Sequence, residues 1–231
     1  MNDDQKRVYE EDKQRRLVNV SGIDFEENEN GPEESVFFLR HGTYTPIDFR
    51  QPLITRHYDN LIDKAEKVLE VGCGTGRNAQ YFLNQTNHIK YYGVDASPLS
   101  LKCFENNTHW DFSDKKDRYY ISNQIDETIL SQEYDLIFSS YVLQHIGFAS
   151  DNTKHDCLSI TRVLVPHLKV GGYWLSYETS SSGQMGWESN PWRTRTLEYM
   201  PNLKVCCVES CQLAGCGPPP HELNIFQKIG E

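Results

Sequence analysis

The sequence predicts an α/β fold built on a mostly parallel sheet. Short apolar strands alternate with helical segments from about residue 53 onward, and this alternation is typical of parallel strands joined by helical crossovers. The first strand runs into a glycine-rich turn, Gly72-Cys73-Gly74-Thr75-Gly76, and the second ends on Asp95. Because ligands bind beyond the carboxyl ends of parallel strands, the glycines and Asp95 predict a nucleotide-cofactor site at that edge.

The predicted elements follow one another in a regular order. Helix 53–65 precedes the first strand, 67–71, whose apolar run ends at Gly72. After them come helix 77–83, strand 89–94, helix 98–106, strands 118–122 and 134–139, helix 157–168, strand 173–177, helix 191–200 and the closing strands 203–213 and 223–229. Gly171-Gly172 is predicted to end helix 157–168, because glycine commonly terminates helices.

Length and charge limit the kind of protein. The 231 residues suffice for one α/β domain with a sizeable core. The 33 Asp and Glu residues outnumber the 23 Lys and Arg residues, and the formal charge of −10 opposes binding to phosphate backbones, so no nucleic-acid partner is expected. No apolar run reaches the ~18 residues of a membrane span, and Met1-Asn2-Asp3-Asp4 is unlike a signal peptide. We expect a soluble, cytoplasmic protein with no membrane partner; its oligomeric state stays open.

Residues 1–35 differ from the rest in composition. They carry eleven acidic and five basic side chains, with too few apolar groups to offset the entropy of ordering, and are predicted to be a mobile acidic arm. The arm either stays solvated or orders as a lid over the cofactor. Residues 36–231 are predicted to form a single domain. Near its start, Tyr44 follows an apolar anchor in a segment with aromatic and basic groups, and is a candidate substrate-binding residue.

The spacing of the glycines decides which cofactor is expected. A dinucleotide site has the pattern G-x-G-x-x-G, but here the third glycine comes one residue early and Arg77 stands where that pattern has glycine. No Lys-Ser/Thr pair follows to make a phosphate-binding loop. Glu70, before the turn, would repel a diphosphate, whereas its carboxylate suits a ligand with sulfonium and ammonium groups. Asp95 lies 19 residues beyond Gly76, close to the roughly 20-residue spacing that places a carboxylate on a ribose diol.

Two motifs in register resemble those of a known enzyme family. Glu-x-Gly-x-Gly-x-Gly, starting at Glu70, resembles motif I of the class I S-adenosylmethionine-dependent methyltransferases, and Gly93-Val94-Asp95-Ala96-Ser97 resembles their motif II. The resemblance covers about residues 60–231. It implies S-adenosyl-L-methionine as the cofactor and a Rossmann-like seven-stranded, mostly parallel sheet with helices on both faces, in which the last hairpin adds one antiparallel strand. The cofactor-binding residues that it implies are Glu70, Gly72, Cys73, Gly74, Gly76, Asp95, Ala96, Ser97, Asn123, Gln124, Ser139 and Ser140.

The third family motif departs from the usual pattern. The family usually carries an aspartate at the end of the third strand, where this chain has Asn123 followed by Gln124. An amide oxygen can accept the same hydrogen bond from the adenine amino group. The alternative role of Asn123 is to cap the start of a helix.

Residues 134–146 resemble motif IV, an apolar strand with small residues and a V-L-x-H end. The resemblance places Ser139 to Tyr141 beside the methyl group, where the Tyr141 ring either faces the sulfonium in a cation–π contact or packs in the core. His145 is the candidate general base, because histidine titrates near neutrality. Its alternative role is to brace the following loop.

Acceptor-binding residues are expected on the connections after the later strands. The segment 178–193 has glycines for mobility and two tryptophans, Trp187 and Trp192, for contact surface, with Arg193 beside them. His221 lies between the last two strands and is a candidate for the opposite wall. The alternative is a solvated turn whose tryptophans fold onto the core.

These features predict an enzyme that transfers a methyl group to oxygen or nitrogen of a small or medium-sized polar acceptor. Such a transfer mainly requires that donor and acceptor are held close and aligned, and the short connections leave no room for a macromolecule-binding domain. One alternative is a protein or peptide methyltransferase whose acidic surface attracts a basic substrate. Another is a non-catalytic subunit that binds the cofactor and activates a partner.

Seven cysteines at irregular positions indicate reduced thiols rather than a disulfide framework. Cys206, Cys207, Cys211 and Cys216 approach zinc-like spacing, but they fall within a strand pattern and lack a long separation between two tight pairs. We therefore predict that this cluster holds no metal.

Overall fold

The structure, a computed structural model, describes residues 64–74, 76, 78–84, 87–105, 112–140, 142–146, 157–179, 181–182, 187–211 and 221–230. Its strands are β1 (Lys67–Val71), β2 (Lys90–Val94), β3 (Tyr119–Ser122), β4 (Tyr134–Ser140), β5 (Leu168–Thr179), β6 (Ser181–Ser182), β7 (Trp187–Glu188), β8 (Leu203–Cys211) and β9 (His221–Lys228). Its helices are α4 (Ala79–Asn84), α5 (Pro98–Glu105), α6 (Glu127–Leu130), α7 (Leu143–Ile146), α8 (Cys157–Leu164) and α9 (Ser189–Tyr199), with short 3₁₀ turns η2 (Ser113–Lys115) and η3 (Val165–His167). None of these helices is long and apolar enough to cross a bilayer. The predicted arm, the domain boundary at residue 36 and most of helix 53–65 lie outside the described residues.

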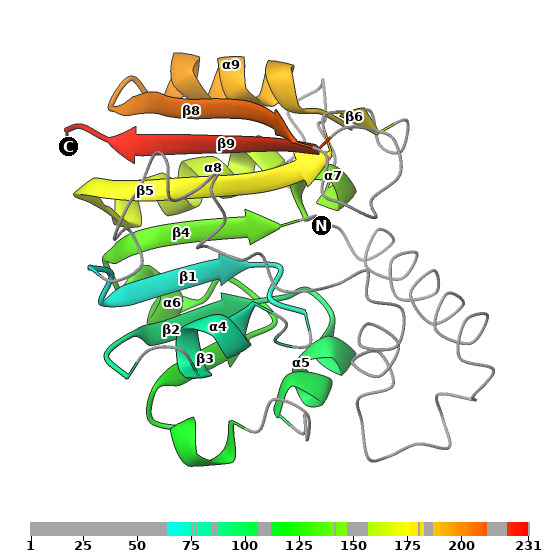
Figure 1. Cartoon of the computed structure of the whole chain (residues 1–231), viewed down its shortest axis with the longest axis vertical. Helices are drawn as coiled ribbons and strands as arrows, with labels where there is room; N and C mark the ends of the chain where they lie inside the picture. The colour runs from blue at the N-terminus through cyan, green and yellow to red at the C-terminus, as the bar shows by residue number, and fades with distance from the viewer. Residues whose placement is uncertain are drawn as a thin grey trace. The chain divides into compact units, whose positions relative to one another are not determined.

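Seven strands form one sheet in the order β3-β2-β1-β4-β5-β9-β8 (Figure 1). β1, β4 and β5 run parallel, as do β2 and β3, whereas β9 runs antiparallel to both β5 and β8. The last hairpin therefore inserts a single antiparallel strand, and the predicted Rossmann-like fold class is confirmed. β6 and β7 form a separate two-stranded ribbon.

The chain divides into two compact units. Among the described residues, the first unit holds 73–124, with β2, β3, α4 and α5. Its core is largely aromatic. The Phe104 ring packs against Tyr91, Phe112 and Tyr119, with ring centroids 6.1, 5.0 and 5.4 Å apart. These rings fill the interior of the unit that carries most of the glycine turn and Asp95.

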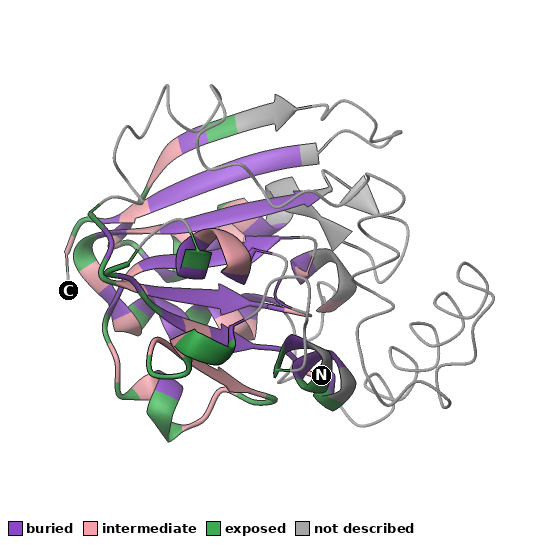
Figure 2. Ribbon diagram, turned by 60° about the horizontal axis from the view of Figure 1, so that its bottom comes forward, coloured by how far each residue is buried: buried purple, intermediate pink, exposed green. Residues whose placement is uncertain are grey.

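The second unit holds residues 64–72 and the described residues from 125 onward. Helices α8 and α9 cover one face of its strands. The Trp192 indole of α9 packs edge-on against Phe226 of β9, with centroids 5.5 Å apart, and donates its N–H to Thr161 of α8 at 3.3 Å. Figure 2 shows the buried residues gathered along the central strands of this unit.

Asp135 ties together the amino ends of three strands. Its carboxylate accepts hydrogen bonds from the backbone N–H groups of Glu66 and Lys67, at 3.0 and 2.9 Å, and from the Lys169 ammonium at 2.7 Å. Burial by itself raises the pKa of Asp135, but the hydrogen bonds from Lys169, Lys67 and Glu66 outweigh it and lower the pKa below its ordinary value. The charged carboxylate therefore stabilises the start of β1, β4 and β5.

The predicted helix 157–168 ends early. α8 stops at Leu164, and η3 carries Pro166, which lacks an N–H and whose ring clashes with the carbonyl one turn back. β5 then begins at Leu168 and contains Gly171 and Gly172, so the prediction that this glycine pair ends the helix was wrong. Glycine is needed within β5 because a Cβ at Gly172 would come within 3.0 Å of the Asp135 carbonyl oxygen.

Candidate active site

The turn after β1 is shaped by glycines with positive φ, 76° at Gly72, 54° at Gly74 and 92° at Gly76. Other residues rarely adopt such angles. A Cβ at Gly72 would lie 2.0 Å from the Val142 side chain, whereas a Cβ at Gly74 would meet none of the described residues within 4 Å. Gly72 is thus required for packing, while the described residues leave space at Gly74 in which a ligand can approach the backbone.

Asp95 holds this turn to the end of β2. The side chain is 7 % exposed, its Oδ2 accepts from the Gly74 N–H at 2.9 Å and its Oδ1 accepts from the Ser97 N–H at 2.9 Å. Sequence reasoning missed the Gly74 contact. The serine two residues after Asp95 is a recognisable signal for an Asx turn, but not for the bond to the glycine turn. A carboxylate oxygen accepts about two hydrogen bonds, so both oxygens can also accept from ligand hydroxyls.

The predicted adenine site also includes Ala96, Ser97, Asn123 and Gln124. Ser97 caps α5, because its buried Oγ accepts from the Ser100 N–H at 3.1 Å. Its hydroxyl is therefore used by the helix. Ala96 is half-buried, and Asn123 and Gln124 are exposed just after β3.

The helix cap proposed as the alternative role of Asn123 belongs to another residue. Asp126 precedes α6, and its side chain accepts from the Ile129 N–H at 3.0 Å. The exposed Asn123 side chain is thus not the cap of α6. Its predicted contact with the adenine amino group stays a prediction.

In the second unit, the predicted cofactor-binding residues lie near the carboxyl ends of β1 and β4. Glu70 is 1 % exposed, Ser139 0 % and Ser140 5 %. Glu70 is in register with Phe138, one residue before Ser139. Polar side chains this deeply buried in central strands are uncommon and call for a structural or ligand-binding reason.

Five predicted residues have no described side chain. Tyr44 and Tyr141 lie outside the described residues, and only the backbones of His145, Trp187 and His221 are described, in α7, β7 and β9. His221 is paired with Thr179, so its backbone lies at the carboxyl end of β5. The roles of all five stay predictions.

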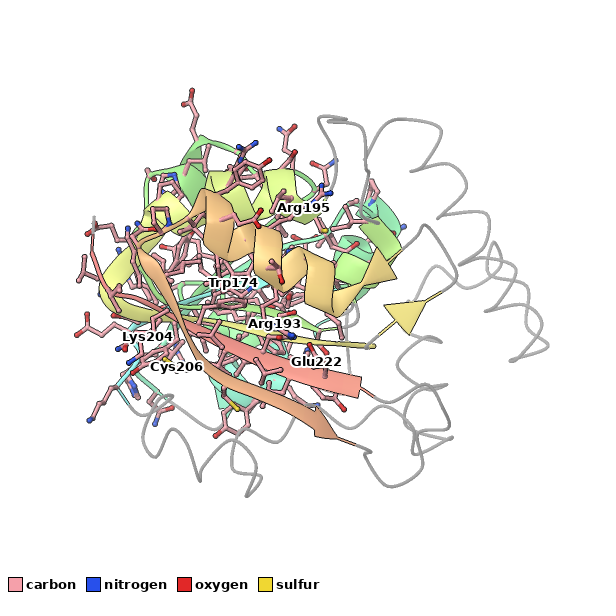
Figure 3. The ribbon with its side chains drawn as sticks, turned by 90° about the horizontal axis from the view of Figure 1, so that it is seen from above. Trp174, Arg193, Arg195, Lys204, Cys206 and Glu222 are labelled. Atoms are coloured by element: carbon pink, nitrogen blue, oxygen red, sulfur yellow. The ribbon has the colours of Figure 1, made fainter. Side chains whose placement is uncertain are left out.

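Two residues predicted to bind substrate have partners within the protein. Trp192 is fully buried against Phe226, so its indole belongs to the core, and the prediction that it offers contact surface to a substrate was wrong. Arg193, the next residue, donates to Glu222 Oε1 at 2.5 Å and to Asn224 Oδ1 at 2.8 Å. Figure 3 shows Arg193 reaching from α9 toward Glu222 on β9. Its guanidinium orients two side chains of β9.

The cysteine cluster is described in part. Cys207 is buried in β8 and Cys206 is half-buried beside it, at a bulge between Val205 and Cys207. The side chain of Cys211 and all of Cys216 lie outside the described residues. That the cluster holds no metal stays a prediction.

Comparison with known protein families supports this interpretation. A family model described as a methyltransferase domain matches residues 69–174. This part of the chain is similar to a methyltransferase domain. The matched segment runs from β1 into β5 and contains the glycine turn, Asp95 and the end of β4, so it includes the motifs that carry the resemblance.

Solved methyltransferases share this fold at low sequence identity. The plantazolicin methyltransferase BpumL, in complex with a triazolic desmethylPZN analog and SAH, gives a TM-score of 0.59 and 13 % identity, over 97 % of this chain and 99 % of its own. The N-methyltransferase NodS from Bradyrhizobium japonicum WM9 gives 0.52 and 16 %, over 79 % of this chain and 99 % of its own. An O-methyltransferase family protein from Burkholderia thailandensis gives 0.57 and 11 %, over 85 % of this chain, and only 58 % of that longer protein is covered.

Proposed function

We propose that this chain is an S-adenosylmethionine-dependent methyltransferase that methylates oxygen or nitrogen of a small or medium-sized polar acceptor. The observation that carries the proposal is the glycine turn, open at Gly74 and fixed by Asp95, inside a methyltransferase domain. S-adenosylmethionine is the methyl donor that this family uses. When bound, it supplies a methyl group on a positively charged sulfur.

The residues of the turn fit that cofactor. The open space at Gly74 gives the methionyl and ribose portion access to the backbone. Each oxygen of the Asp95 carboxylate accepts one hydrogen bond, from the N–H group of Gly74 or of Ser97. The second lone pair of each oxygen accepts a hydrogen bond from a ribose hydroxyl. The buried Glu70 carboxylate favours the ligand's cationic groups and disfavours a diphosphate. Asn123 accepts from the adenine amino group.

The chain's own part in the transfer is to align the acceptor and to take its proton. Ser139 and Ser140 border the acceptor at the end of β4, and His145 of α7 acts as the base. Because imidazole accepts a proton only in its neutral form, the reaction slows as the pH falls through the range where histidine titrates.

A protein or peptide acceptor is the second candidate. The formal charge of −10 favours encounter with a basic chain. A non-catalytic subunit that binds the cofactor and activates a partner is the third candidate, and methyl transfer by the chain purified without a partner would exclude it.

Two measurements test this function. Titration calorimetry should detect binding of S-adenosylmethionine and of S-adenosylhomocysteine, and no binding of NAD. Host extract separated into metabolites and macromolecules should then receive label from methyl-labelled cofactor in the metabolite fraction. Label only in protein moves the acceptor to the second candidate, and the absence of binding by either cofactor form overturns the proposal.

A further inference from the structure

A buried row of polar side chains crosses the second unit near the carboxyl end of β4. Ser139 of β4 is in register with Ser176 of β5, and Ser176 is in register with Asn224 of β9. Residues directly opposite on neighbouring strands point to the same face, with Cβ atoms roughly 5 Å apart. All three side chains are 0 % exposed. We call Ser139, Ser176 and Asn224 the polar row.

The polar row is short of hydrogen-bond partners. Within the described part of the chain, Ser139 Oγ, Ser176 Oγ and Asn224 Nδ2 are buried and have none. About nine-tenths or more of buried polar groups in proteins are hydrogen-bonded, because leaving one unpaired carries its full desolvation penalty. Three such atoms on three adjacent strands point to a polar group from outside the protein that completes them.

Charged side chains adjoin the polar row. Glu178 and Glu222 face each other across β5 and β9, two residues from Ser176 and Asn224 and on the same face, and are 0 % and 9 % exposed. Arg193 donates to Glu222 and to the amide oxygen of Asn224, which fixes the orientation of that amide (Figure 3). Two carboxylates in a buried site disfavour an anion, because charges interact more strongly away from water.

The hydrogen-bonding chemistry of these side chains indicates which kind of ligand would fit the polar row. A serine hydroxyl can donate or accept a hydrogen bond, whereas a carboxylate only accepts, so the adjoining carboxylates favour a group with several N–H donors. Asn224 Nδ2 is a donor and requires an oxygen. From this inventory we infer that the polar row binds an acceptor with an amine group next to a carbonyl or hydroxyl oxygen. The inference rests on the proposed function and narrows its acceptor to amines.

Three small probes that differ in one group test the inference. Glycinamide, glycolamide and malonamate share a carboxamide and end in an ammonium, a hydroxyl and a carboxylate. Ligand-observed NMR on the full chain, saturated with S-adenosylhomocysteine, should show binding of glycinamide, roughly tenfold weaker binding of glycolamide, since charged hydrogen bonds are the stronger ones, and none of malonamate. Equal binding of all three, stronger binding of malonamate, or no binding of glycinamide at millimolar concentration overturns the inference.

Variants separate a ligand site from a pocket for buried water. Ser176→Ala removes one hydroxyl without adding volume and should weaken glycinamide binding several-fold. Glu178→Gln should weaken glycinamide more than glycolamide, whereas Glu198→Gln, on the exposed side of α9, should change neither. If Ser176→Ala alters only the stability of the protein, the polar row holds water and the inference fails, whether or not Glu178→Gln folds.

Cofactor binding, measured by calorimetry on the same samples, distinguishes the two proposals. If S-adenosylhomocysteine binds and glycinamide does not, the amine inference fails alone. If neither binds, the proposed methyltransferase function fails with it.

Discussion

Asp95 in the first unit and the polar row in the second differ in how their hydrogen bonds are satisfied. In the first unit, both oxygens of Asp95 accept from backbone N–H groups, so this carboxylate is hydrogen-bonded to the turn in the absence of a ligand. In the second, the polar row carries three atoms that have no partner among the described residues. Polar side chains that are hydrogen-bonded within the protein are preorganised, whereas buried polar atoms without a partner form hydrogen bonds only when a ligand binds. Under the proposed function, the protein itself pairs the carboxylate that binds the cofactor, and the acceptor pairs the atoms of the polar row.

The largest effect is expected at His145, which lies in the second unit. His145→Ala should lower turnover by roughly 10²–10⁴-fold and leave affinity for S-adenosylhomocysteine unchanged, because a base acts on the acceptor's proton and not on cofactor binding. Methyl transfer measured across pH should fall on the acid side in the wild type and lose that dependence in the variant. Near-full turnover in the variant would make His145 a residue that braces the loop, and would weaken the contrast between the units.

Arg193 donates a hydrogen bond to Asn224 of the polar row and forms an ion pair with Glu222. Arg193→Ala should destabilise the chain by about 3 kcal/mol, because it leaves the largely buried Glu222 without its guanidinium. Urea unfolding measures this loss. Lys204→Ala is the control, since Lys204 is an exposed cation on β8. Equal losses in the two variants would mean that the ion pair has no special part in holding β9.

Asp95, whose carboxylate is hydrogen-bonded to the glycine turn, is expected to contribute to cofactor affinity. Asp95→Ala should weaken binding of S-adenosylhomocysteine by roughly 1.5–3 kcal/mol, the contribution of a charge-assisted hydrogen bond. Calorimetry gives the value, with the exposed Asp117→Ala as control. Asp95→Asn, which keeps the size and one acceptor, should fall between wild type and Asp95→Ala. Unchanged affinity in Asp95→Ala would remove the assignment of this carboxylate to the ribose.

The smallest effect concerns Asp135 and acid stability. Its pKa is lower in the folded chain than in the unfolded chain. The stability that it contributes is therefore present above the ordinary aspartate pKa and is lost as the pH falls through the lowered value. Asp135→Asn should flatten the acid-side decline of the unfolding free energy, measured in urea between neutral and acidic pH. The same change at Asp117 should leave that decline as it is in the wild type.

The sequence predicted the elements best where the signals are local. β1 was expected at 67–71 and spans Lys67–Val71, because its apolar run meets Gly72, where the chain must turn with positive φ. The predicted helix 157–168 ends early for a local reason too, because Pro166 follows its last turn and cannot continue it.

The candidate site was harder to predict where distant segments meet. α9 is mostly polar in sequence, and whether its lone tryptophan faces solvent or core is decided by Thr161 and Phe226, which belong to other elements. The polar row depends on the register of β4, β5 and β9, which no local pattern specifies. A local signal was present, because Ser139 follows the apolar run 136–138, Ser176 follows the apolar run 173–175, and Asn224 lies between Leu223 and Ile225.

The hydrogen bonds of Asp135 have a practical consequence. They lie at the amino ends of β1, β4 and β5, while Ser139 and Ser176 lie toward the carboxyl ends of β4 and β5. A group that stabilises the strands thus lies at the opposite end from the proposed acceptor site. If the polar row binds the acceptor, substitutions around Glu66 and Lys169 can be selected for stability separately from substitutions near the polar row that change selectivity.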